Sequence, residues 1–151
     1  NQKTMNSIYN KTSNEVMITR INSLTSESKP LWGKMTVDQM LRHCTSAANV
    51  AFGTQDLRVN FLMRFLGKSM KTKIFNSAFK KNSPTAKEFI FTDTKDFNQS
   101  KLELIECVAL FSQGHQIIKV LDHPFWGKMT YEDWDKLVWN HLDHHLNQFG
   151  V

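Results

Sequence analysis

The residues best suited to chemistry lie near the C-terminal end of the sequence. His141 and His145 are four positions apart, so in an α-helix their imidazoles lie one above the other on the same face. Two imidazoles in this arrangement can share one divalent metal ion. His43 lies in a different amphipathic segment, and we expect it to complete a three-histidine metal site held between two helices.

Three neutral imidazoles bind zinc, nickel, copper or iron and leave coordination positions open, which is typical of catalytic rather than structural sites. Zinc in such a site lowers the pKa of bound water to about 7, and a coordinated thiol is deprotonated. Leu142 follows His141, whereas the metalloprotease motif H-E-x-x-H has glutamate at that position. Peptidase activity is therefore disfavoured.

The other histidines are weaker candidates. His144 is rotated by roughly 60° from His141 around a regular helix, so it lies beside the site or at the surface. If the helix register differs from the expected one, His144 replaces His141 or His145 as a ligand. His115 and His123 fall where a helix ends and where a loop meets Pro124, and we expect them to be capping or loop residues.

We assign no catalytic role to any carboxylate from the sequence. Asp143 is rotated by roughly 200° from His141 and points outward. Asp38, Glu103 and Glu106 serve as acid–base groups or as partners of the ligands only if their helices turn them inward.

The spacing of the apolar residues predicts the helices that must position the histidines. It predicts a polar, frayed start over residues 1–11 and four helices. The helices cover Val16 to Leu24 with an end before Pro30, residues 36–53, residues 98–113, and residues 130–149. Phe89-Ile90-Phe91 is expected to be a short extended segment. The fourth helix buries Trp134 on the stripe that carries His141 and His145.

A short sequence occurs twice, each time before a helix that carries histidine. PLWGKMT at residues 30–36 returns as PFWGKMT at residues 124–130. The proline and glycine reverse the chain, the aromatic ring covers the end of the helices, and the threonine caps the next helix. We interpret the repeat as paired architecture for starting helices, not as a catalytic motif.

The lengths of the connections between the helices predict the topology. Short turns join the first helix to the second and the third to the fourth, whereas roughly 45 residues separate the second from the third. The expected fold is all-α, an up-down-down-up four-helix bundle with a long basic crossover between its second and third helices. We expect one domain over residues 1–151.

The crossover concentrates the positive charge of the chain, whose formal net charge is +5. Residues 58–87 contain eight lysines and arginines and no acidic residue. We interpret this stretch as a partly helical connection that packs its phenylalanines on the core and exposes its lysines to water. Attraction of an anionic cofactor or substrate is the alternative, and we expect neither nucleic acid nor a membrane as a partner.

The composition, with 40% hydrophobic and 22% charged residues, fits a soluble protein. No apolar run reaches the length of a membrane span, and the first residues do not lead into a hydrophobic signal core, so we expect a cytoplasmic protein. Cys44 and Cys107 both lie in apolar helical stretches, and buried thiols are favoured over a disulfide.

From about residue 28 to its end, the sequence resembles the DinB-like four-helix-bundle superfamily and, within it, the uncharacterised DUF1569 family. The resemblance rests on HLDHHLNQFG at 141–150, HPFWGK at 123–128 followed by Glu132 and Trp134, and WGKM at 32–35 leading to His43. It implies a bundle whose second helix supplies one metal-binding histidine, here His43, and whose fourth supplies two, here His141 and His145. It also implies zinc or nickel, and a likeness in fold to transferases or isomerases that use low-molecular-weight thiols.

These observations lead to a functional hypothesis. We expect a divalent-metal-binding protein, a metal-dependent transferase or hydrolase acting on a small molecule, with an anionic thiol as one candidate substrate. The alternatives are a non-catalytic metal- or ligand-binding bundle and a homo-oligomeric interaction domain, such as a homodimer.

Overall fold

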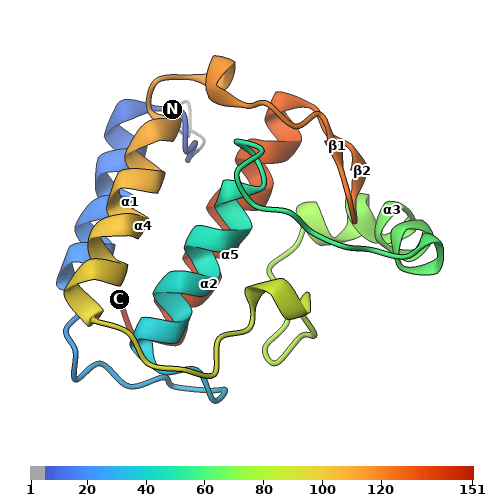
Figure 1. The fold of residues 1–151 in the computed structure, drawn as a ribbon. Coiled ribbons are helices and arrows are strands. Elements are labelled where there is room, and N and C mark those ends of the chain that lie inside the picture. Colours follow the sequence, from blue (N-terminus) through green and yellow to red (C-terminus); the bar gives the residue numbers. More distant parts are fainter. Residues whose placement is uncertain (1–5) are drawn as a thin grey trace.

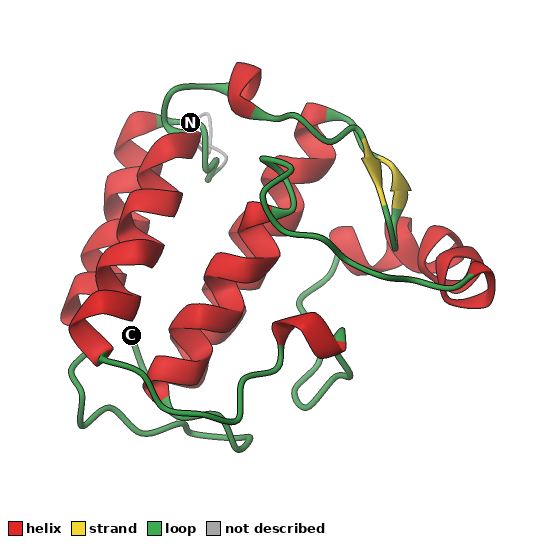
Figure 2. Ribbon diagram, in the orientation of Figure 1, coloured by secondary structure: helices red, strands yellow, loops and turns green. Residues whose placement is uncertain are grey.

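The computed structural model describes residues 6–151, and this part of the chain is mostly helical (Figure 2). Its α-helices are α1 (Lys11–Ser23), α2 (Val37–Asn49), α3 (Phe61–Phe75), α4 (Phe97–Phe111) and α5 (Tyr131–Gln148). Single 3₁₀ turns are formed by Lys87–Phe89 and His115–Ile117, and β1 (Asp122–His123) pairs antiparallel with β2 (Gly127–Lys128). Within residues 6–151, no helix combines the length and the apolar character needed to cross a membrane.

Four of the helices pack around a common core. Contacts join α1 to α4, α4 to α2, α2 to α5 and α5 back to α1. In Figure 1, α1 and α5 run downward while α2 and α4 run upward, and α3 lies apart beside β1 and β2. The long connection between α2 and α4 therefore leaves the packed helices, forms α3, and returns.

The helices that carry histidine begin as the sequence predicts. Thr36 accepts a hydrogen bond from the backbone N–H of Gln39, whose side chain accepts one from the backbone of Thr36 in return. Thr130 and Asp133 form the same reciprocal pair at the start of α5. Such capping boxes satisfy N–H groups that have no partner inside the helix. The predicted threonine caps are confirmed.

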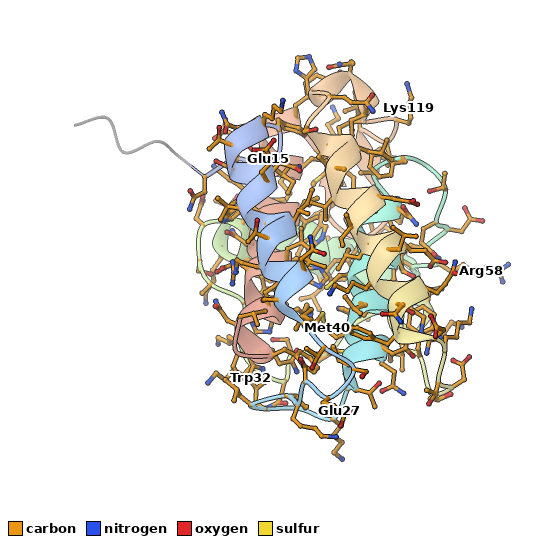
Figure 3. The ribbon with its side chains drawn as sticks, turned by 90° about the vertical axis from the view of Figure 1, so that its left-hand side faces the viewer. Glu15, Glu27, Trp32, Met40, Arg58 and Lys119 are labelled. Atoms are coloured by element: carbon orange, nitrogen blue, oxygen red, sulfur yellow. The ribbon has the colours of Figure 1, made fainter. Side chains whose placement is uncertain are left out.

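Trp134 belongs to the buried core. Its side chain is fully buried, and its indole N–H donates to the carbonyl of Val120 at 2.7 Å, so the predicted burial of Trp134 is confirmed. Met40, labelled in Figure 3, is also fully buried among the packed helices. Cys44 and Cys107 are buried free thiols, as expected.

Two local expectations are corrected by the structure. Residues 1–5 of the expected frayed start lie outside the described part of the chain, but Ile8 is fully buried and its backbone N–H donates to Asp135 at 2.7 Å. The burial of Ile8 and this bond anchor the chain ahead of α1. Phe89 ends a 3₁₀ turn instead of starting an extended segment, and its backbone carbonyl is used elsewhere in the fold.

The expected packing of the crossover phenylalanines holds for Phe75, which is buried, but is wrong for the first half of α3. Phe61 and Phe65 are 85% and 64% exposed. Arg64 and Lys71 instead turn toward the body, where they form ion pairs with Asp122 at 2.6 Å and Asp133 at 2.9 Å. These acidic partners hold the cationic side chains of α3 against the body.

A candidate metal centre

The structure brings the three predicted histidines together between α2 and α5. One ligand nitrogen from each of His43, His141 and His145 lies within 4.8 Å of the other two. The Nε2 atoms of His43 and His141 are 3.0 Å apart. The ring centroids are separated by 4.6 to 4.9 Å. Three imidazoles thus surround one point in space.

Packing of the neighbouring residues fixes the direction of these imidazoles. On α5, Leu142 and Leu146 are each only 1% exposed, and their burial sets the rotation of the helix that places His141 and His145 against α2. On α2, the fully buried Met40 holds the turn that precedes His43. Because residues i and i+4 share a helical face, both α5 imidazoles meet the single one from α2.

Hydrogen bonding determines which nitrogen of His43 faces the centre. Its Nδ1 lies 2.9 Å from the backbone carbonyl of Phe89. A carbonyl oxygen can only accept, so Nδ1 carries the proton and donates it. In the neutral ring, the lone pair is then on Nε2, which points at His141.

Two hydrogen bonds in series determine which nitrogen of His145 faces the centre. The Gln148 side-chain amide donates through Nε2 to the backbone carbonyl of Trp32 at 2.8 Å. This contact orients the amide, so that Oε1 faces His145 Nδ1 at 2.7 Å. Nδ1–H of His145 is therefore the donor, and the lone pair of Nε2 is free.

Gly33 makes room for this chain of bonds. A Cβ atom at this position would lie 2.7 Å from Gln148 Nε2, and the backbone has φ of +80°. Both the backbone conformation and the close approach favour glycine. The first copy of the repeated sequence thus supports the histidine cluster through Trp32 and Gly33.

The environment favours neutral imidazoles. Burial lowers the pKa of His43, whose residue is only 3% exposed. Burial, followed by the neighbouring His43, lowers the pKa of His145 to about 3. The pKa of His141 is held well below its usual range by burial and then by His145 and His43. At neutral pH all three rings are in the form that can bind a metal ion.

Aromatic side chains cover the cluster. The ring of Phe79 lies 5.7 Å from that of His141 and 5.9 Å from that of His144. Trp32 lies 5.6 Å from His144, and the ammonium of Lys81 stands 4.2 Å from the centre of the Trp32 ring. His144 is thus packed beside the cluster, while His43, His141 and His145 form it.

The carboxylates considered from the sequence lie elsewhere. Buried Asp38 accepts from Arg42 and Ser100, Glu103 accepts from Gln99 on an exposed face, and Glu106 is exposed. Asp143 pairs with Arg20 at 2.7 Å, in agreement with the predicted outward direction. Among the described residues, no carboxylate is a hydrogen-bond partner of the three imidazoles.

The remaining histidines have structural positions. The His123 Nδ1 accepts hydrogen bonds from the backbone N–H groups of Phe125 and Trp126 at 3.0 and 3.2 Å, and the residue is buried. His115 is exposed and lies 4.4 Å, between ring centroids, from Tyr131. Neither belongs to the cluster.

Two groups that orient the imidazoles were not predicted from the sequence. Gln148 follows His145 by three positions, and this spacing places polar side chains on one helical face, so the pattern contained a signal. The carbonyl of Phe89 had none, because a backbone atom 46 positions from His43 leaves no mark in residue types.

Comparison with protein-family models matches residues 5–150 to the family described as "Protein of unknown function (DUF1569)". The search of curated proteins and the search of solved structures gave no match.

Proposed function

This chain belongs to the DUF1569 family, and we propose that it binds one divalent transition-metal ion through His43, His141 and His145. We further propose that the metal-bound protein is an enzyme of the transferase or hydrolase type. The observation that carries the proposal is the convergence of three neutral imidazole nitrogens within 4.8 Å of one another.

The donor set fits such an ion. Zinc binds imidazole nitrogens at about 2.0–2.1 Å, which requires the nitrogens to lie roughly 3–4 Å from each other. Two Nε2 atoms already lie at 3.0 Å. The Nδ1 partners of His43 and His145, which are the Phe89 carbonyl and the Gln148 amide, are of the kind that orients metal-binding histidines in known sites. Zinc and nickel are both compatible with three imidazoles.

The chain contributes three things to this site. It holds the imidazoles in the neutral state, it fixes Nε2 as the inward atom in His43 and His145, and it limits access of water with Phe79. When bound, the ion would supply a Lewis acid able to activate water or a thiol.

A second candidate, a non-catalytic metal- or ligand-binding protein, is favoured by one observation. Among the described residues, no carboxylate accepts a hydrogen bond from the cluster, so the site lacks an evident general base. We therefore place no residue in a catalytic role. A transferase that uses a thiol needs such a base least, because a metal-bound thiol is deprotonated without one.

We also infer that α1, α2, α4 and α5 form the up-down-down-up bundle of the DinB-like superfamily. The closed order of their contacts and their directions in Figure 1 support this inference. Membership of that superfamily would imply a similarity in fold to enzymes that use low-molecular-weight thiols. An anionic thiol is therefore the co-substrate we propose to test first.

Elemental analysis of the protein purified without a histidine tag tests metal binding. We expect about one equivalent of metal per chain, and loss of that metal from the His141→Ala/His145→Ala double variant. His115→Ala, which removes an exposed histidine outside the cluster, is the matched control and should retain the metal. Equal metal content in the double variant and the wild type would refute the site.

Turnover separates the enzyme from the binding protein. The metal-loaded wild type should conjugate a small thiol to an electrophile, or hydrolyse an activated ester, faster than the double variant. A protein that holds metal but accelerates neither reaction would favour the non-catalytic alternative.

A further inference from the structure

We propose that the outward face of α3 is a docking surface for an anionic lipid bilayer, on which the helix lies parallel to the membrane plane. This inference is independent of the metal centre and replaces the expectation that no membrane takes part. It rests on which side chains α3 turns outward and on the charge that surrounds them.

The outward face of α3 is apolar. It presents large exposed side chains over its first three turns: Phe61, Leu62, Met63, Phe65, Leu66 and Met70. Phe61 and Leu62 are 85% and 72% exposed. A continuous apolar patch on one helix is uncommon on a soluble monomer and marks a surface that binds something.

The inward face is polar, and its contacts hold the helix in this orientation. Arg64 and Lys71 pair with Asp122 and Asp133 of the body. Gly67 packs so closely on the backbone of Phe125 that a Cβ atom would lie 2.8 Å from its carbonyl carbon. Rotating α3 to bury Phe61 and Phe65 would break both ion pairs and lose this contact. The apolar face is thus presented by the fold itself.

The charge around the patch identifies the partner. The exposed cations Arg58, Lys68, Lys73 and Lys80 lie on α3 or on the segments that flank it, and residues 58–87 contain no acidic residue. Large apolar side chains bordered by lysines are typical of helices that lie in the interface of anionic membranes.

A second copy of this chain fits the surface less well. A two-fold dimer through α3 would place the same patch on both sides of the interface. It would therefore bring two cationic borders together, with no acidic residue from either α3 segment to pair with them.

Vesicle co-sedimentation tests the proposal. The untagged protein is mixed with phosphatidylcholine vesicles, with and without phosphatidylserine as roughly a third of the lipid. We expect binding to the anionic vesicles, at least about tenfold weaker binding to the neutral ones, and weaker binding at high salt. Absence of binding to anionic vesicles, or equal binding to both kinds, would overturn the proposal.

Two double variants locate the surface. Phe61→Ser/Phe65→Ser should weaken binding about tenfold or more, because both rings leave the apolar face. Val16→Ser/Leu102→Ser, at positions 54% and 52% exposed on α1 and α4, is the matched control and should bind like the wild type. Equal loss in both variants would overturn the assignment to α3. A dimer of the wild type that Phe61→Ser/Phe65→Ser dissociates would show that a second copy covers the patch.

Discussion

At the scale of single residues, the Gln148 amide decides which nitrogen of His145 faces the other two histidines of the candidate metal centre. It accepts from Nδ1–H of His145 and is itself oriented by the carbonyl of Trp32. A bond of this kind makes the ligand ring both fixed in direction and more basic.

Gln148→Ala should therefore weaken metal affinity by roughly 10–100-fold, measured by competition with a chromogenic chelator. Asn147→Ala is the control, because Asn147 is exposed and bonds to Arg20 and Asp143 instead of a cluster histidine. Unchanged affinity in Gln148→Ala would mean that His145 needs no such support or does not bind the ion.

His123 gives a prediction about pH that is independent of the metal. Burial, followed by the nearby Arg64, lowers its pKa to about 4, while Asp122 acts in the opposite direction. The unfolded chain has an ordinary histidine pKa near 6.5, so between these values the unfolded state binds more protons. The contribution of His123 to stability is therefore present at neutral pH and is lost as the pH falls from about 6.5 to about 4.

The His123→Asn variant keeps a side-chain acceptor for the backbone N–H groups of Phe125 and Trp126 but cannot titrate. Relative to this variant, the wild type should lose on the order of 3 kcal/mol of unfolding free energy across that pH range. Urea denaturation at several pH values measures the difference. Parallel pH profiles of the two proteins would contradict the assignment.

At the scale of elements, α5 depends on Trp134 for its position. The indole is fully buried and donates to Val120 at 2.7 Å. Trp134→Ala should cost about 3–5 kcal/mol of unfolding free energy in chemical denaturation, because it leaves a cavity and an unpaired carbonyl. Trp134→Phe retains most of the volume and should cost less. A loss below about 1 kcal/mol for the alanine variant would be inconsistent with this packing.

The elements also show how far the sequence could predict this molecule. The apolar stripes located α2, α4, α5 and the later part of α1, and the threonine caps marked the starts of α2 and α5, since both signals are local. The first helix was predicted from Val16, but α1 begins earlier, at Lys11. For residues 58–87 the sequence predicted a partly helical connection, but it did not show which side chains of α3 face the body. That choice depends on Asp122 and Asp133, which lie some 60 positions away along the chain.

The candidate metal centre could likewise be predicted only in part. His141 and His145 were recognisable together because one helix spaces them, and the family resemblance pointed to His43. The Phe89 carbonyl could not be predicted, because its contact with His43 depends on the path of a loop.

At the scale of the whole molecule, the ion would stabilise the fold. The nitrogens of His43 and His141 come from positions 98 residues apart, so the unfolded chain does not present them together. A ligand that binds only the folded state at 100 times its Kd adds about 2.7 kcal/mol. Removing the metal with EDTA should lower Tm by roughly 5–10 °C for a domain of this size, measured by calorimetry.

The His141→Ala/His145→Ala variant serves as the control for this measurement, and its Tm should not respond to EDTA. If EDTA does not change the Tm of the metal-loaded wild type, the ion is bound somewhere that folding does not create.

Along the chain, the exposed stretch 80–85 lies between His43 and the pair His141 and His145. Cleavage there would leave α1, α2, α3 and His43 in one polypeptide, and α4, α5, His141 and His145 in the other. The packing of α2 on α4 and the ion between α2 and α5 would then hold two separate polypeptides together. Metal availability would govern the assembly of complementing fragments, as it would govern the folding of the intact chain.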